Sequence, residues 1–354
     1  MGARRGLLVA LLVVAGCAAD GSAATAPTTT RATTTRPTTT RPTTTLAPIA
    51  DPKAPATILT PGEDAPNPFV LHEGGTYWLY ASQKEFYGDN LQVRSGPDLH
   101  HLGPVHDALP VLPDWVWAGF TWAPDVRHIG NRYVLWFTAG VVESRPDAPR
   151  PTQCIGVATS SSPDGPFTGV GDGPAICQRQ RWGSIDPRTF RDVDGQLWLH
   201  WKSDDNAEVD GTTHSSIYAQ RLAADGITLV GRAMRILEAD QPWEGRIVEA
   251  PQLIRVGGRY WLFYSGNWFN QPVYGIGVAE CAGPAGPCRK RLRRPWLGSN
   301  PQGAGPGESS LFHDAGGWWI LYGPWAVDFE ASTPRPAALA RVGFGPLGPY
   351  LARP

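Results

Sequence analysis

The chain has few charged residues and no excess of either sign. Charged residues make up 18% of its 354 residues, against roughly 25% in an average soluble domain. The chain has 31 basic and 32 acidic residues, so it lacks the basic excess that is typical of nucleic-acid-binding proteins. No apolar run reaches the ~18 residues of a membrane-spanning helix. These absences argue against a nucleic-acid partner and against a membrane-spanning helix.

Sequence motifs of several enzyme classes are also missing. There is no P-loop, no dinucleotide-binding glycine pattern and no G-x-S-x-G elbow. The cysteines lack the C-x2-C or H-x3-H spacing of a zinc site. Abundant instead are 41 Gly, 35 Pro and 15 Trp, beside only 2 Met. Many turn residues together with many aromatic residues favour a β-protein with short strands.

Residues 1–17 have the pattern of an export signal. Arg4 and Arg5 precede a short apolar core from Leu7 to Ala15, as in secretory signals. The core ends in V-A-G-C at Cys17, which resembles a bacterial lipobox, where the cysteine is acylated. A lipid on Cys17 would anchor the protein to the outer face of the membrane. The alternative is an ordinary cleaved signal and a secreted protein.

Residues 18–48 are predicted to form a disordered tether. The segment TTTRATTTRPTTTRPTTT has no apolar periodicity with which to bury a core, and a Pro/Thr chain of this kind acts as a spacer. Without residues 1–48 the chain retains 31 − 5 = 26 basic and 32 − 1 = 31 acidic residues. This net charge of −5 fits a neutral ligand better than a polyanion. We expect residues 49–354 to form one globular domain, and the protein to be a monomer.

Four cysteines lie within the predicted domain, and an even number in an exported chain favours disulfides. Three pairings are possible. Proximity in the sequence favours Cys154–Cys177 and Cys281–Cys288, because each pair closes a short loop.

A repeated block dominates the predicted domain. A turn glycine followed by an aromatic-rich alternating strand occurs five times, with the glycines 55, 65, 63 and 59 residues apart. A short apolar strand precedes each block and another strand follows it. The five glycines are Gly75, Gly130, Gly195, Gly258 and Gly317. Three or four strands repeated five times predict an all-β fold, a five-bladed β-propeller whose first strands surround a central axis.

Polar residues stand at the start of each predicted first strand. These starts are Asn67-Pro68, Ala123-Pro124-Asp125, Asp186-Pro187, Glu249-Ala250-Pro251 and Gly307-Glu308-Ser309. In a propeller these side chains would converge on one axial pocket. Glycoside hydrolysis requires two carboxylates facing each other, one to protonate the departing oxygen and one to activate water.

Three longer segments, in order and in register with the blades, carry a family resemblance. They are TWAPDV (121–126), SIDPRTFRDVDGQLWLHW (184–201) and WEGRIVEAPQLIRVGGRYWLFYSGN (243–267). Together they resemble motifs of glycoside hydrolase family 43, five-bladed enzymes that cleave arabinan and xylan, and the resemblance covers nearly all of 60–330. It implies an inverting glycosidase for α-L-arabinofuranosyl or β-xylosyl linkages that requires no cofactor.

The resemblance also implies roles for two carboxylates. Glu249 corresponds to the general acid, and Asp186 to the third carboxylate that orients the acid and tunes its acidity. Burial in an apolar, Trp-lined pocket and a nearby anion both favour the protonated form that an acid needs. Taken singly, Asp186 would be a turn-capping residue and Glu249 a solvated strand end.

The first two blades offer Asn67 and Asp125 to the predicted pocket. The family has an Asp base where this chain has Asn67, and an amide cannot take a proton from water. Losing a general base commonly costs ~10²–10⁴ in rate. Asn67 would then position water or sugar, with Asp64 or Glu63 as a substitute base if that loop folds inward. Asp125 is expected to support the substrate or the pocket.

The fifth blade departs from the family as well. The resemblance implies G-P-G-H with the His near a central ion, often calcium, whereas this chain has Gly305-Pro306-Gly307-Glu308. Three alternatives are open for Glu308. It would be an oxygen ligand for calcium in the central channel, a displaced base facing Glu249, or a rim residue bound to water or a nearby Arg.

Aromatic and basic residues beside the motifs are candidate sugar contacts. Trp122 and Trp182 lie near the motifs rather than in the aromatic blocks, and an aromatic face suits the CH-rich face of a sugar ring. Arg246 would hold a carboxylate or a sugar hydroxyl. Two other functions remain open, a carbohydrate-binding propeller without catalysis, favoured by Asn67, and a protein-interaction scaffold.

Overall fold

The computed structural model describes residues 57–83, 88–143, 151–207, 213–301, 303–328 and 334–352. The predicted signal (1–17) with Cys17 and the predicted tether (18–48) lie outside these residues. Within them, no helix combines the length and the apolar character needed to cross a membrane.

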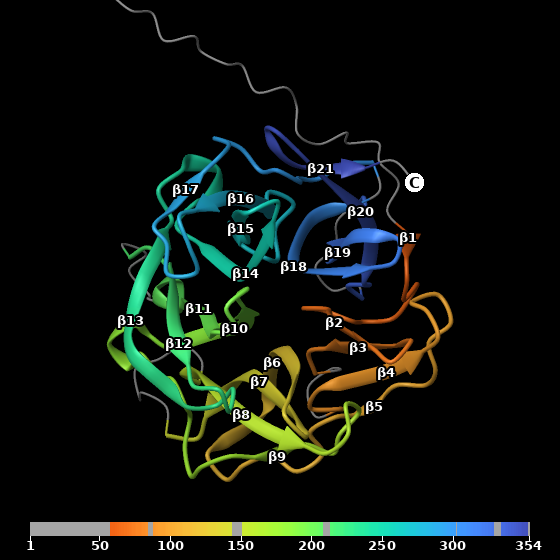
Figure 1. Ribbon diagram of the computed structural model, residues 1–354, viewed down its shortest axis with the longest axis vertical. Coiled ribbons are helices and arrows are strands. Elements are labelled where there is room, and N and C mark those ends of the chain that lie inside the picture. The colour runs from red at the N-terminus through yellow and green to blue at the C-terminus, as the bar shows by residue number, and fades with distance from the viewer. Residues whose placement is uncertain are drawn as a thin grey trace, which may run out of the picture. The chain divides into compact units, whose positions relative to one another are not determined.

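Five antiparallel sheets surround a central axis, as Figure 1 shows. Blade 1 is β2 (Phe69–Glu73), β3 (Thr76–Ala81), β4 (Gln92–Gly96) and β5 (His106–Asp107). Blade 2 is β6 (Val116–Ile129), β7 (Arg132–Val141), β8 (Gln153–Ser160) and β9 (Thr168–Gly169). Blade 3 is β10 (Ser184–Arg191), β11 (Leu197–Ser203), β12 (Ser216–Leu222) and β13 (Leu229–Glu238).

Blade 4 is β14 (Val248–Val256), β15 (Arg259–Gly266), β16 (Gly275–Cys281) and β17 (Cys288–Lys290). Blade 5 is β18 (Ala304–Asp314), β19 (Gly317–Trp325), β20 (Ala338–Gly345), β21 (Gly348–Ala352) and β1 (Thr57–Ile58). In the described ranges, three short 3-10 helices connect strands, namely η1 (Arg179–Arg181), η2 (Asp205–Ala207) and η3 (Pro242–Glu244). The predicted five-bladed propeller is confirmed, with the first strand of each blade nearest the axis (Figure 1).

The first described strand belongs to the last blade. β1 pairs antiparallel with β20, with Thr57 opposite Leu339 and Ile58 opposite Ala338. Backbone hydrogen bonds from the start of the domain therefore close the ring of blades. The repeat pattern did not predict this strand, because two residues are too few to show an alternation.

The apolar core lies between the blades. The described residues contain five buried clusters, and each combines side chains of two adjacent blades. Trp136, Trp201 and Trp261 from the second strands of blades 2, 3 and 4 are almost fully buried. Large aromatic side chains dominate such cores, so these tryptophans join blade to blade.

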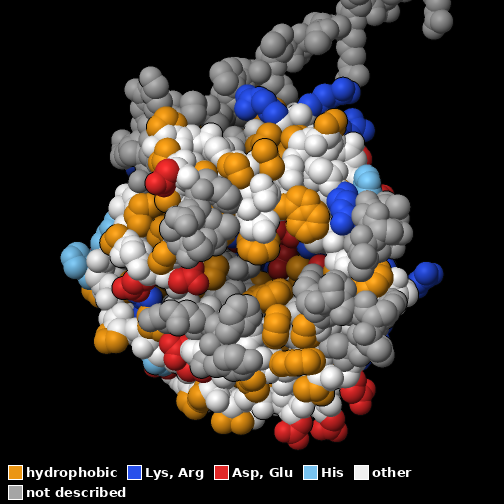
Figure 2. Space-filling view, turned by 180° about the vertical axis from the view of Figure 1, so that it is seen from behind, with side chains coloured by type: hydrophobic (Ala, Val, Ile, Leu, Met, Phe, Trp, Pro, Cys, Tyr) orange, Lys and Arg blue, Asp and Glu red, His pale blue; other side chains and the backbone are white. Residues whose placement is uncertain are grey.

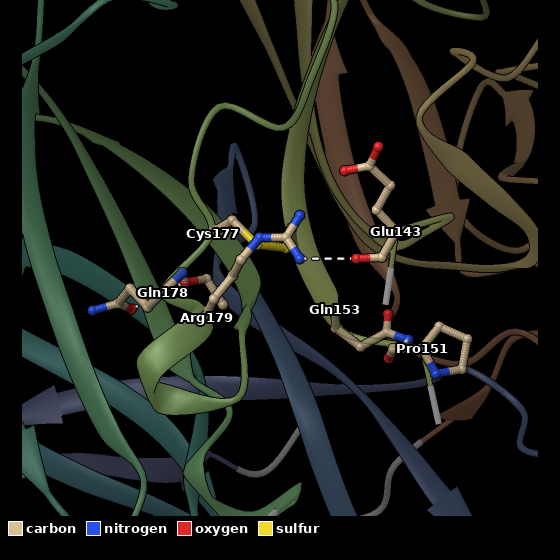
Figure 3. Close-up of a disulfide and its surroundings, with 8 residues drawn as sticks. Glu143, Pro151, Gln153, Cys177, Gln178 and Arg179 are labelled. Carbon is tan, nitrogen blue, oxygen red and sulfur yellow. Dashed lines mark hydrogen bonds between the residues drawn. A yellow bond between two sulfur atoms is a disulfide. The ribbon is translucent and has the colours of Figure 1, made fainter. Parts of the chain in front are cut away.

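The described residues contain two disulfides, with the predicted pairing. Cys154 in β8 is bonded to Cys177, just before η1, and Cys281–Cys288 closes the turn between β16 and β17. Figure 3 shows the first of them, where Arg179 Nη1 donates a 2.9 Å hydrogen bond to the Glu143 carbonyl.

A residue with a left-handed backbone recurs at the start of each blade, and in blades 2 to 5 it lies at a β-bulge. One residue there has a positive φ of 47–56°, and register shifts follow in β6, β10, β14 and β18. These residues are Asn67, Ala123, Asp186, Ala250 and Glu308. A non-glycine residue in this conformation costs on the order of 1–2 kcal/mol. Bulges change the direction of side chains beside active sites. The backbone strain at these five residues therefore accompanies the placement of their side chains near the axis.

Hydroxyl groups of the preceding blade hold three of these bulges. Ser82, Thr138 and Ser265 accept hydrogen bonds of 2.9–3.1 Å from the backbone N–H of Ala123, Asp186 and Glu308. The sequence predicted first strands that begin at Pro68, Pro124, Pro187, Pro251 and Ser309. The observed strands in blades 2 to 5 begin several residues earlier, because the bulge lets the strand continue past it.

Candidate active site

Three carboxylates from three blades meet at the axis. Asp186 in β10, Glu249 in β14 and Glu308 in β18 each offer one oxygen atom, and these atoms all lie within 4.8 Å of one another. Each residue is only 6% exposed. Figure 2 shows acidic side chains at the bottom of a central hollow surrounded by hydrophobic side chains. The structure thus brings together the predicted acid, the predicted orienting residue and the fifth-blade Glu.

Two further polar residues complete this cluster. Lys202 in β11 places Nζ 2.8 Å from Oε2 of Glu249 and 3.5 Å from Oδ1 of Asp204. The Tyr274 hydroxyl lies 2.7 Å from Oε1 of Glu249 and 2.9 Å from Oε1 of Glu308. Sequence reasoning missed both residues. The available signal was a lysine inside an otherwise apolar strand pattern, LWLHWKS.

Burial sets the protonation of the cluster. Burial and the charge of Glu249 raise the pKa of Asp186 to about 7, against the opposing effects of Lys202 and the Ala250 N–H, which donates 2.9 Å to Oδ2. Burial, Asp186 and Glu249 also raise the pKa of Glu308 well above its usual range. These two carboxyls therefore hold protons more tightly than ordinary carboxyls do.

The ammonium beside Glu249 stays charged. Burial alone would lower the pKa of Lys202, but Glu249, Asp204 and Asp186 together raise it above its usual value. Glu249, the residue that the motif predicts to be protonated, is thus the carboxylate in direct contact with a cation.

The pKa of Asp186 predicts a stability that falls with pH. The folded state holds this proton up to about pH 7, whereas an unfolded Asp releases it near pH 4. Folding stability therefore falls as the pH rises between these values. We expect Asp186→Asn to gain stability at pH 7.5, with an upper bound of about 4 kcal/mol, and the gain to vanish at pH 4. Urea unfolding at both pH values measures it, and a gain independent of pH would contradict it.

Comparison with known proteins agrees with this geometry. The sequence profile of glycosyl hydrolases family 43 matches residues 61–344. The chain belongs to glycosyl hydrolases family 43. It is therefore a glycosidase, as its motifs predict. Glycosidases of family 43 typically need no cofactor, in agreement with the expectation from the sequence.

Individual relatives of this family-43 chain are distant. The β-D-galactofuranosidase xynD of Aspergillus niger is 26% identical over 293 residues, which cover 78% of each chain. An extracellular endo-α-(1→5)-L-arabinanase of Thermotoga petrophila is 25% identical over 259 residues, 62% of this chain and 50% of the relative. The crystal structure of a thermostable family-43 glycoside hydrolase superimposes with a TM-score of 0.71 at 25% identity, covering 83% of this chain and 96% of that one.

The residue predicted to occupy the family-43 base position is an amide. Asn67 occupies the bulge position of blade 1, two residues before β2, and is half-buried. Neither proposed substitute replaces it in the structure. Glu63 pairs with Arg94 at 2.7 Å, and Asp64 accepts a 2.9 Å hydrogen bond from the Arg335 N–H. These contacts direct both carboxylates to other partners.

The family-43 ion position does not fit a cation in this chain. Calcium takes six to eight oxygen ligands. Here the Lys202 ammonium already contacts Glu249, and the Tyr274 hydroxyl lies between Glu249 and Glu308. A cation among these carboxylates would be repelled by the ammonium. We therefore assign no step to a metal ion.

Asp125 in β6 contacts residues of blade 3. It is fully buried and accepts a 3.1 Å hydrogen bond from the Thr189 N–H and a second from the Thr189 hydroxyl, while Arg188 Nη1 lies 3.8 Å away. These contacts join blade 2 to blade 3. Of the two roles expected for Asp125, support of the substrate or of the pocket, these contacts are compatible with the second, which stays a prediction.

The candidate sugar contacts lie in different surroundings. Trp122 in β6 packs near Phe120 with ring centroids 6.1 Å apart, and Trp182 follows η1; both are half-buried. Arg246 lies over the Trp268 ring at 5.5 Å, and its Nη1 is buried without a hydrogen-bond partner among the described residues. An unused buried donor of this kind suits a sugar hydroxyl, so Arg246 stays the best supported of the three.

Proposed function

We propose that the protein hydrolyses α-L-arabinofuranosyl or β-xylosyl linkages in arabinan- or xylan-type polysaccharides, with inversion, and that Glu249 protonates the departing oxygen. The observation that carries this proposal is the buried pair of Asp186 and Glu249 in one axial pocket of a family-43 propeller. The Ala250 N–H, next to Glu249, donates to Asp186, which supports the orienting role of that carboxylate. The relative named as an arabinanase supports the substrate class.

A β-D-galactofuranosyl linkage is the second candidate substrate. The A. niger relative, with the match that covers 78% of each chain, is named a β-D-galactofuranosidase. α-L-Arabinofuranose and β-D-galactofuranose share the configuration of their ring carbons and differ only in the exocyclic chain. A pocket built for one furanose ring can therefore accept the other when the exocyclic group has space.

A panel of substrates tests both candidates. Purified protein is incubated with 4-nitrophenyl α-L-arabinofuranoside, β-D-xyloside and β-D-galactofuranoside, and with arabinan and arabinoxylan. We expect release from a furanoside, and proton NMR of the first product should show the inverted anomer. Retention would contradict the mechanism. Binding of oligosaccharides without any turnover would favour the non-catalytic carbohydrate-binding propeller.

We also propose that the protein is exported and attached to the cell surface through a lipid on Cys17, with the predicted tether as spacer, and that it acts as a monomer on a polysaccharide. Several relatives are named extracellular, which supports export. Mass spectrometry of the N-terminal peptide tests the anchor, since an acylated Cys17 carries a mass increase that an ordinary cleaved signal would not leave. Light scattering tests the monomer.

A further inference from the structure

We propose that Glu308 and Tyr274 form a proton relay to Glu249, so that the proton given to the departing oxygen comes from Glu308 through the Tyr274 hydroxyl. This inference rests on the proposed role of Glu249 as the general acid. It gives the Glu in the fifth-blade motif a function that is neither a metal ligand nor a base.

The hydrogen atoms available at Tyr274 dictate the direction of the relay. Its hydroxyl lies within hydrogen-bond distance of two carboxyl oxygens, at 2.7 Å and 2.9 Å. A phenol has one hydrogen to donate, and its oxygen can accept another. Both contacts are favourable only when one carboxyl accepts from Tyr274 and the other is protonated and donates to it.

The surroundings decide which carboxyl is protonated. Oε2 of Glu249 accepts from the Lys202 ammonium at 2.8 Å, an interaction that favours its ionised form. Among the residues that the structure describes, no such cation lies at hydrogen-bond distance from Glu308; the nearby guanidinium of Arg335 donates to the carbonyls of Gly323 and Gly305. Glu308 is thus the donor to Tyr274, and Tyr274 is the donor to Glu249.

The charged groups around Glu308 agree with this assignment. Asp186 and Glu249 are the anions facing it, and Arg335 and Arg188 are the cations. Burial and the two anions raise the pKa of Glu308 well above its usual range despite Arg335. Among the described residues, no hydrogen bond joins Asp186 to Glu249. The Tyr274 hydroxyl, in contrast, contacts both Glu308 and Glu249, so it connects these two carboxyl groups directly.

The Tyr274 ring is held firmly in place. A Cβ at Gly307 would lie 1.9 Å from Cε1 of Tyr274, so only glycine fits beside the ring. The Arg335 guanidinium lies 5.3 Å from the ring centroid, a cation–π distance. Burial and the two glutamates raise the pKa of Tyr274 well above 10. Tyr274 therefore donates its proton to Glu249 only as it receives another from Glu308, and it does not persist as a phenolate.

The step balances in atoms and charge. The Glu308 carboxylic acid gives its proton to the Tyr274 oxygen while Tyr274 gives its own hydrogen to Oε1 of Glu249. Glu308 becomes a carboxylate, Tyr274 remains a phenol and Glu249 becomes the acid. Glu249 then protonates the glycosidic oxygen as the C–O bond breaks. The proton released by the attacking water restores the Glu308 acid by way of solvent.

The test compares leaving groups in Glu308→Gln and Tyr274→Phe. The second change keeps the ring and removes only the hydroxyl. Wild type and variants are assayed on an unactivated oligosaccharide and on a 2,4-dinitrophenyl glycoside, whose leaving group needs no proton. We expect both variants to lose about tenfold to a hundredfold on the oligosaccharide, less than the ~10²–10⁴ of losing the acid itself, and to keep near-normal rates on the dinitrophenyl glycoside. The alkaline limb of the pH profile should move to lower pH.

Two outcomes overturn the relay. Equal losses on both substrates would show that Glu308 and Tyr274 have a structural role only, and unchanged rates on the oligosaccharide would show that Glu249 gains its proton elsewhere. Glu249→Gln, assayed in parallel, separates this failure from failure of the proposed function. If Glu249→Gln shows no dependence on the leaving group, Glu249 is not the acid. If the loss in Glu249→Gln depends on the leaving group but the loss in Tyr274→Phe does not, only the relay is wrong.

Discussion

Asn67→Asp is expected to raise kcat on oligosaccharides by ~10²–10⁴, the usual contribution of a general base. The resemblance to family 43 implies an Asp base at this position. The two carboxylates nearest in sequence have other partners: Glu63 pairs with Arg94, and Asp64 accepts a hydrogen bond from the Arg335 N–H. Glu308 cannot replace the base across the sugar. It lies within 4.8 Å of Glu249, whereas an inverting pair is ~6.5–9.5 Å apart to admit water.

The substitution suits the backbone. Asn67 has a φ of 54°, a conformation that Asn and Asp adopt more readily than other non-glycine residues. Asn67→Gly is the matched control, because glycine keeps this conformation and supplies no base. We expect Asn67→Gly to show no gain, and added formate to accelerate this glycine variant more than Asn67→Asp. A rate for Asn67→Asp equal to wild type would show that the base is another group.

The blades and two of the carboxylates could be predicted from the sequence because both depend on local patterns. Alternating aromatic residues after a turn glycine are sufficient to indicate a strand, which the structure shows to be the second strand of its blade. Five such strands in one chain indicate a five-bladed propeller. Asp186 and Glu249 stand at fixed places relative to these strands. Their convergence then follows from the symmetry of the fold.

The electrostatic partners could not be predicted in this way. Lys202 reaches Glu249 from a neighbouring blade, and Tyr274 reaches two blades at once. These contacts depend on side-chain directions and on the bulge at residues such as Asp186 and Glu308, which strand periodicity does not encode. The expectation of a simple protonated acid therefore missed the ammonium that the fold places beside it.

Glu249→Gln is expected to reduce kcat/KM on unactivated oligosaccharides by ~10²–10⁴ and to leave a 2,4-dinitrophenyl glycoside much less affected. A glutamine keeps the volume and can accept from Tyr274, but it has no proton to give. Initial rates on the two substrates at one pH measure the difference. Equal losses on both would mean that Glu249 does not act as the acid.

Loss of folding must be separated from loss of chemistry, because Glu249→Gln leaves Lys202 beside an amide. Removing one partner of a buried ion pair costs roughly 3–5 kcal/mol, and Asp204 at 3.5 Å should lower that cost here. The double variant Glu249→Gln with Lys202→Met removes the uncompensated charge. We expect urea unfolding to show recovered stability in the double variant, while its activity on oligosaccharides stays at the level of Glu249→Gln. Recovery of activity together with stability would assign the loss to folding, and Glu249 would no longer be required as the proton donor.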